Sequence, residues 1–151
     1  TAFPLPSADK LPAVTEARLT FLTPLRLQHQ GQPVRPHALT PRKLIADLMR
    51  RITLLAEFHA GRPELVANAR ELVHHSEGLT HQQELRWHDW SRYSSRQKQE
   101  MTLGGALGNW VLSGDLAPLL PWLHLGQWLH VGKNATLGLG AYRLDTLIPQ
   151  H

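Results

Sequence analysis

Eleven consecutive residues near the C-terminal end of the chain have the composition of an anion-binding loop. The stretch His130–Gly140 reads HVGKNATLGLG. Glycine lets backbone N–H groups approach a ligand without a Cβ in the way, and a lysine adds a mobile positive charge. Backbone amides beside a cation typically bind phosphate. The residues expected to do so are Gly132, Lys133, Asn134, Thr136, Gly138 and Gly140.

Two well-known nucleotide-binding motifs do not fit this stretch. A Walker loop has four residues between its first Gly and its Gly-Lys pair, followed by Ser or Thr. Here five residues separate Gly126 from Gly132, and Asn134 follows Lys133. The dinucleotide fingerprint opens a helix after a first strand, whereas this stretch follows a helix-like run. A phosphate-binding loop and a turn whose glycines only relieve backbone strain remain as the alternatives.

Bulk properties limit the kind of protein this is. The chain has 151 residues, of which 42% are hydrophobic, and this suits one domain with a real core. It has no run of 18 apolar residues for a membrane helix. The net charge of +4 favours polyanionic partners. Cysteine is absent, which removes disulfides and thiolate metal sites and fits a reducing cytoplasm.

Hydrophobic periodicity predicts the elements that must position the Gly-rich stretch. The alternation of Ala17, Leu19 and Phe21 indicates a strand in which Pro24 marks an edge or a bulge. Thr40-Pro41 is a helix start, and Asp115 is predicted to cap a later helix. The expected elements are a strand over 17–27, a helix over 40–58, an additional helix over 63–78, strands over 84–93 and 101–112, a helix from 115, and a strand over 139–147.

This order is βαββαβ with an extra helix after the first one, the pattern of the α+β ferredoxin-like fold. We expect residues 17–147 to form this domain around a four-stranded antiparallel sheet, and residues 1–16 to be a lead-in or linker. The first and third strands then lie centrally, so Arg26 should approach the glycines of 101–112. The Gly-rich stretch should lie at one end of the sheet.

Other polar residues allow a functional and a plain structural interpretation. Arg92, Arg96 and Lys98 lie in the hairpin between the middle strands and either line a groove or form a solvated turn. His130 either touches phosphate or caps a helix C-terminus. The arginines and lysine at 42, 43, 50 and 51 are interpreted as a solvated helix face. The histidines at 74, 75, 81 and 88 lack the spacing and the companions of a metal site, and the tryptophans are interpreted as core residues.

Three segments, in order, resemble one known family, the CRISPR-associated endoribonucleases of the RAMP superfamily that cut precursor CRISPR RNA within its repeats. Leu19–Leu25 looks like the strand that opens the family's C-terminal domain. The hairpin from Arg92 to Lys98, followed by the glycines at 104, 105 and 108, looks like its central hairpin. His130–Gly140 is similar to its Gly-rich loop.

The resemblance covers residues 17–147 and concerns the C-terminal half of family members, which carry two ferredoxin-like domains. It implies a cytoplasmic endoribonuclease whose partners are CRISPR repeat RNA and other CRISPR-associated proteins. It also implies attack of a 2′-OH on the adjacent phosphate without metal or cofactor, assisted by acid–base groups. The family's catalytic histidine lies in the N-terminal domain, so no catalytic residue is assigned here.

Two alternatives to an endoribonuclease remain open. One is a non-catalytic RNA-binding subunit of a CRISPR effector complex on the same fold. The other alternative, from another class, is a ferredoxin-like domain that binds a small molecule or a protein, since this fold hosts many functions.

Overall fold

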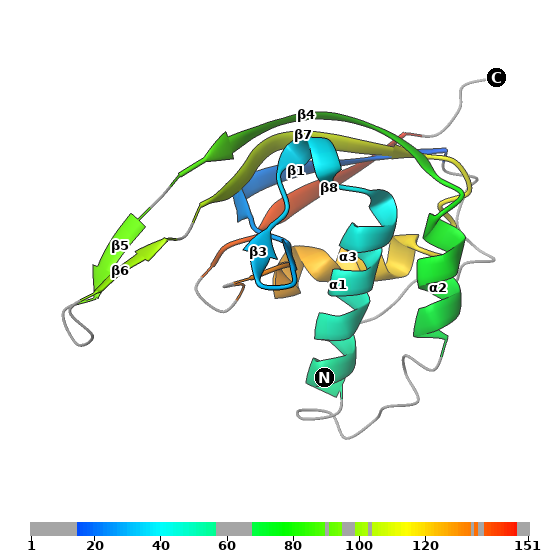
Figure 1. Ribbon diagram of the computed structural model, residues 1–151. Coiled ribbons are helices and arrows are strands. Elements are labelled where there is room, and N and C mark those ends of the chain that lie inside the picture. The colour runs from blue at the N-terminus through cyan, green and yellow to red at the C-terminus, as the bar shows by residue number, and fades with distance from the viewer. Residues whose placement is uncertain are drawn as a thin grey trace.

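The computed structural model of the chain describes residues 15–56, 68–89, 91–94, 99–102, 104–133, 135 and 138–147. Within these residues a four-stranded antiparallel sheet has the strand order β4-β7-β1-β8 (Figure 1). Its strands are β1 (Glu16–Leu25), β4 (Thr80–His88), β7 (Gly105–Ser113) and β8 (Tyr142–Leu147). The first and third of them are central, which confirms the ferredoxin-like prediction.

The helices cover one face of this sheet (Figure 1). They are α1 (Pro41–Leu55), α2 (Ala69–Ser76) and α3 (Leu120–Leu129). As predicted, Thr40 caps α1, because its hydroxyl accepts a hydrogen bond from the Lys43 amide, and Pro41 occupies the first turn. No helix in the described part of the chain is long and apolar enough to cross a membrane.

The segment between β1 and α1, residues 26–40, contains short regular pieces in place of a plain loop. Strands β2 (Gln28–His29) and β3 (Gln32–Pro33) form a small hairpin, and a 3₁₀ turn, η2, spans Pro36–Ala38. Both pieces lie close to the sheet: the Val34 amide donates to the Leu27 carbonyl, and the Gln83 side chain donates to the Pro36 carbonyl. Gln28 of this segment lies near Gly132 and Lys133 of the Gly-rich loop.

The core lies between the sheet and the helices. Ala17, Leu19 and Phe21 of β1 point into it and are at most 3% exposed, so the predicted alternation is correct. Trp110 of β7 is fully buried. The apolar stripe of α1 packs against this layer through Leu44, Ile45, Leu48, Met49 and Ile52. Trp128, in contrast, is 57% exposed, so the interpretation of every tryptophan as a core residue is wrong for this one.

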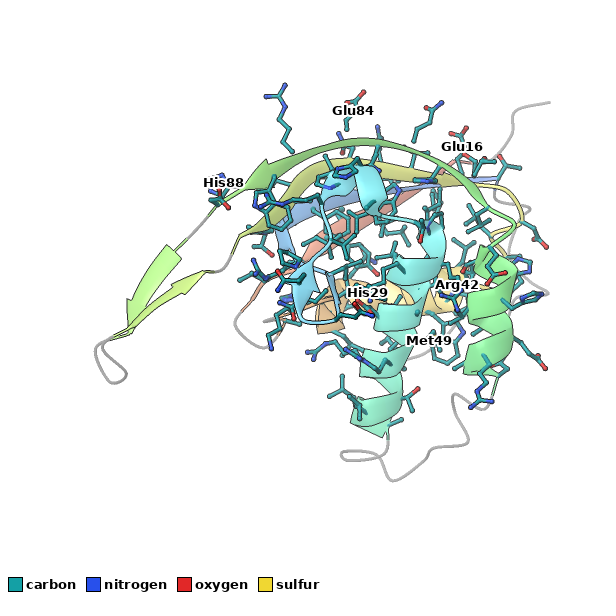
Figure 2. All side chains as sticks on the ribbon, in the orientation of Figure 1. Glu16, His29, Arg42, Met49, Glu84 and His88 are labelled. Carbon is teal, nitrogen blue, oxygen red and sulfur yellow. The ribbon has the colours of Figure 1, made fainter. Side chains whose placement is uncertain are left out.

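The opposite face of the sheet is not covered by the helices. Figure 2 shows Glu16 and Glu84 pointing away from them. The strand alternation places three arginines and three carboxylates on this face: Arg18, Arg86, Arg143, Glu16, Glu84 and Asp145. None of its described residues is Phe, Tyr or Trp. This face therefore has balanced charge and lacks the large aromatic rings on which RNA-recognition sheets stack bases.

Strands β4 and β7 continue into an arm that projects from the sheet (Figure 1). The arm consists of β5 (Ser91–Ser94) and β6 (Gln99–Thr102), which pair with each other and not with the main sheet. The single strands predicted over 84–93 and 101–112 are therefore each divided. Gly105 contributes to this division, because a Cβ there would lie 2.5 Å from the Leu25 carbonyl oxygen. As predicted, Arg26 is close to these glycines: its guanidinium donates to the Gly104 carbonyl at 3.0 Å.

Two boundary predictions are wrong for local reasons. Asp115 does not cap α3, which begins at Leu120, because Pro121 has no N–H and is tolerated only in a first turn. β8 begins at Tyr142 and not at residue 139. Pro24 is not on an edge strand, since β1 is central; it lies at a register shift between Phe21 and Leu25, which agrees with the bulge alternative.

Tight packing between α3 and β8 generates a stability prediction. The Tyr142 hydroxyl is buried and donates to the Leu123 carbonyl, and a Cβ on Gly126 would collide with it. We expect Gly126→Ala to destabilise the protein by about 1–3 kcal/mol through overpacking, although alanine favours helix by ~1 kcal/mol. The same change should cost much less in a Tyr142→Phe background. Denaturant unfolding of the four proteins measures this coupling, and equal costs in both backgrounds would contradict the contact.

The same hydroxyl predicts a pH effect. Burial raises the pKa of Tyr142 above its ordinary value. A tyrosine that stays neutral in the folded state but ionises in the unfolded chain contributes stability that is fully present below about pH 10 and is lost as the pH rises further. The unfolding free energy of the wild type should therefore fall more steeply above about pH 10 than that of Tyr142→Phe. Parallel slopes for the two proteins would contradict this expectation.

Candidate functional site

The Gly-rich loop, residues 130–140, docks onto the C-terminal end of β1. The Gly140 amide donates to the Pro24 carbonyl at 2.9 Å, and the Lys133 amide donates to the Arg26 carbonyl at 2.7 Å. The Val131 amide donates to the Gly140 carbonyl at 3.2 Å and closes the loop on itself. The loop is therefore held by Pro24, which lies in the bulge of β1, and by Arg26, which follows the strand.

Thr23 holds the same loop through its side chain. Its hydroxyl donates to the Gly138 carbonyl at 2.6 Å and accepts from the Ala141 amide at 2.9 Å. One hydroxyl group thus joins β1 to the last turn of the loop and to the start of β8. Two of the segments that carried the family resemblance, 19–25 and 130–140, are in direct contact.

The three glycines of the loop have different surroundings. Gly132 and Gly140 have φ values of 93° and 72°, and a Cβ on either would collide with a backbone carbonyl, that of Arg26 or Val131. These two glycines are therefore required by the chain's own packing. Gly138 has a φ of 96° and nothing within 4 Å of the place of its missing Cβ. Of the three, only Gly138 leaves open space at the surface of the loop.

The remaining predicted site residues are found at several places. His130 is the C-cap of α3 with a φ of 63°, as the capping alternative predicts, and its amide donates to the Gly126 carbonyl. The Lys133 side chain is exposed. Arg92 lies on β5, in the arm. Asn134, Thr136, Arg96 and Lys98 lie outside the described residues.

Two arginines of α1, Arg50 and Arg51, lie near the loop, and Arg51 departs from the interpretation of these residues as a solvated face. Arg51 is half-buried, and its Nε donates to the Leu129 carbonyl at 2.7 Å, at the C-terminus of α3. Burial lowers the pKa of the Arg51 guanidinium from its ordinary value, but arginine remains charged in proteins. Arg50, the residue before it, is exposed. The only signal in the sequence is that two adjacent cations interrupt an apolar helix.

A cavity of about 280 Å³ lies where these elements meet. It is lined by Gln28, Asp47, Arg50, Arg51, Leu54, Leu55, Gly132, Lys133 and Ala135. The cations come from α1 and from the Gly-rich loop, which lie about 80 residues apart in the sequence. Asp47 is the one carboxylate among the lining residues that the structure describes, and it pairs with Lys43 at 3.3 Å.

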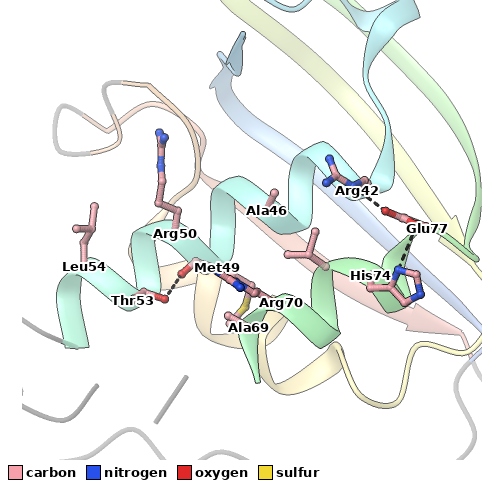
Figure 3. Close-up of a pocket in the computed structure, with 11 residues that line it drawn as sticks. Arg42, Ala46, Met49, Arg50, Thr53, Leu54, Ala69, Arg70, His74 and Glu77 are labelled. Carbon is pink, nitrogen blue, oxygen red and sulfur yellow. Dashed lines mark hydrogen bonds and ion pairs between the residues drawn. The ribbon is translucent and has the colours of Figure 1, made fainter. Parts of the chain in front are cut away.

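A larger cavity of about 690 Å³ separates α1 from α2 (Figure 3). One end is closed by Glu77, which pairs with Arg42 at 2.8 Å and with His74 at 3.4 Å. Met49 and Val73 contribute to its apolar part. Arg50 lines both cavities, and in Figure 3 its side chain points from α1 away from α2.

Two of the histidines weighed as metal ligands in the sequence analysis have separate hydrogen-bond partners. His75 Nε2 lies 2.7 Å from the Asp115 carbonyl oxygen, and His81 Nδ1 accepts from the Trp110 indole at 2.9 Å. Among the residues that the structure describes, no three His, Cys, Asp or Glu side chains gather as a metal site would require.

Comparison with known protein families identifies the chain. A family model described as CRISPR-associated endoribonuclease Cas6 matches residues 19–142. The chain belongs to the Cas6 family. The matched span runs from β1 to the start of β8, so it includes α1, the arm and the Gly-rich loop. No curated protein sequence matches the chain.

Solved Cas6 structures have the same fold. Cas6 of Thermus thermophilus aligns over 91% of this chain with a TM-score of 0.65 and 19% identity. A Cas6 product complex aligns over 91% with a TM-score of 0.60 and 22% identity. A partial Cas6-RT-Cas1–Cas2 complex aligns over 91% with a TM-score of 0.60 and 20% identity. The chain spans only 56%, 54% and 23% of these three proteins.

The Thr23 hydrogen bonds generate a prediction about the loop. Thr23→Val keeps the shape of the side chain but removes its hydroxyl, so the Gly138 carbonyl and the Ala141 amide lose their partner. We expect the free energy of unfolding to fall by about 1–3 kcal/mol. Amide hydrogen exchange at Gly140 and Ala141 should become faster.

A matched control for this variant is available on the same strand. Thr20→Val removes a hydroxyl that bonds Asn109 on the open face of the sheet and does not touch the loop. It should leave exchange in residues 130–141 unchanged. If the two variants have equal effects on loop exchange, Thr23 does not hold the loop.

Proposed function

We propose that this chain is the RNA-gripping part of a Cas6 endoribonuclease that cleaves precursor CRISPR RNA within its repeats. The observation that carries the proposal is the family match over residues 19–142. The cations of α1 and of the Gly-rich loop support it, because they converge at one end of the sheet and phosphate contacts dominate affinity for nucleic acid.

The proposal assigns the RNA to the loop end of the sheet and not to its open face. Lys133, together with Asn134 and Thr136, would donate hydrogen bonds to backbone phosphates, and Gly138 would allow the RNA to approach the loop closely. Arg92, Arg96 and Lys98 of the arm would extend the contact along the RNA. His130, half-buried at the C-terminus of α3, lies beside the loop and is the histidine best placed to touch the RNA.

The cleavage step belongs to the whole protein in this proposal. The RNA 2′-OH attacks the adjacent phosphorus, the bond to the 5′-oxygen of the next nucleotide breaks, and a 2′,3′-cyclic phosphate remains. A general base takes the 2′-OH proton and a general acid protonates the leaving 5′-oxygen. Cations near the phosphate stabilise the extra negative charge of the phosphorane. The metal-independent route is part of the proposal, as is association with other CRISPR-associated proteins.

The test of this function uses full-length protein, labelled repeat RNA and EDTA. We expect cleavage that a single 2′-deoxy substitution at the cut site abolishes, with a cyclic phosphate on the 5′ product. Tight binding without cleavage would instead favour a non-catalytic RNA-binding subunit. If this chain alone cleaves the RNA, catalytic groups lie within it, and His29, His37 and His130 are the first residues to substitute.

The assignment of Lys133 generates a separate prediction. Lys133→Ala removes one positive charge from the loop, so it should weaken binding of repeat RNA. The slope of log affinity against log salt concentration should become less steep by about 0.7 per lost phosphate contact. Filter binding over a range of salt concentrations measures both quantities. An unchanged affinity and slope would remove Lys133 from the interface.

A further inference from the structure

The cavity between α1 and the Gly-rich loop has the charge of an anion site. Three of its lining residues are cations, Arg50, Arg51 and Lys133. Asp47, the one carboxylate among the described residues of the lining, is mostly buried and pairs with Lys43 on the preceding turn of α1. Cations that line a concave, partly dry surface raise the local concentration of anions. The cavity therefore favours a negatively charged ligand.

The back wall of the cavity is fixed by hydrogen bonds. Arg51 is held at the C-terminus of α3 through the Leu129 carbonyl, and the main chain at Lys133 is held by the Arg26 carbonyl. Gly132 is packed so closely on Arg26 that no side chain fits there. A ligand would thus meet a preformed wall, and this lowers the entropic cost of binding.

The front of the cavity is formed by long and exposed side chains. Arg50 and Lys133 are both exposed, one on α1 and one on the loop, so their charged groups can approach a ligand from two sides. Arginine offers a planar fork that matches two phosphate oxygens, while lysine acts as a point charge. Gln28 adds an amide at the edge.

The size and the lining of the cavity limit what fits. Its volume of about 280 Å³ lies at the lower end of the range of small-molecule sites. Leu54, which is 47% exposed, and Leu55 add apolar surface to the lining, on which a sugar ring can lie. The arrangement suits one phosphate with its adjoining ribose, and it is too small for a stack of bases.

We propose that this cavity holds one phosphodiester of the bound RNA, gripped by Arg50 and Lys133 against the fixed Arg51. This assignment rests on the proposed function and adds to it: α1 becomes part of the RNA-binding surface, and one defined phosphate of the RNA is bound more tightly than its neighbours. Arg51 acts as the fixed charge at the back of the cavity.

The test combines protein variants with RNAs in which one linkage at a time is an uncharged methylphosphonate. In the wild-type full-length protein, one linkage should be most sensitive, with a loss of about 10-fold in affinity. Arg50→Ala and Lys133→Ala should each lower affinity for unmodified RNA, and the same methylphosphonate should then cost each variant little. The double variant should lose less than the product of the two single effects, because both residues serve one phosphate.

The matched control is Arg42→Ala. Arg42 is an exposed arginine of the same helix, but it pairs with Glu77 and does not line this cavity. It should keep wild-type affinity and the full methylphosphonate sensitivity. Circular dichroism and thermal melting verify that each variant is folded.

Two outcomes would overturn the assignment, and they differ in meaning. If the wild type binds repeat RNA while Arg50→Ala matches Arg42→Ala in affinity and in methylphosphonate sensitivity, the phosphate site is wrong and the proposed function stands. If the full-length wild type does not bind repeat RNA at all, the proposed function fails and this assignment fails with it.

Discussion

The arrangement at the loop end of the sheet depends on the docking of the Gly-rich loop onto the last residues of β1. Hydrogen bonds from Lys133 and Gly140 to main-chain carbonyls at 24 and 26, together with the Thr23 hydroxyl, hold the loop in one place. Because Gly132 and Gly140 contact backbone directly, larger residues do not fit at either position. The described ends of the loop, at Gly132 and Lys133 and at Gly138 and Gly140, are therefore fixed to the rest of the domain.

This docking brings together charges that are far apart in the sequence. Arg51 binds the end of α3, where the loop begins, and cations of α1 and of the loop line one cavity. Arg26 extends the connection to the base of the arm through the Gly104 carbonyl. The open face of the sheet offers balanced charge and, among its described residues, no Phe, Tyr or Trp. Electrostatics and side-chain chemistry thus favour the same end of the molecule for a polyanion.

The sequence predicts the fold well because the apolar pattern is regular. The alternation in β1, the Thr40 cap and the order of elements are all local signals, and the contact of Arg26 with Gly104 follows from the predicted sheet order. The prediction for Asp115 was wrong because residue types that cap helices are also common in turns, and Pro121 delays the start of α3. The role of Arg51 was not predictable, since an arginine that reaches a helix end 78 residues away looks like any solvated arginine.

The most direct measurement of the central claim is amide hydrogen exchange of the full-length protein with and without repeat RNA. The account predicts that RNA slows exchange in residues 22–29 and 130–141, where the loop and the end of β1 meet, and leaves β4 unchanged between residues 80 and 86. Slowed exchange confined to the open face, in β4 and β7, would contradict it, because the RNA would then lie on the sheet in the manner of other RNA-recognition domains.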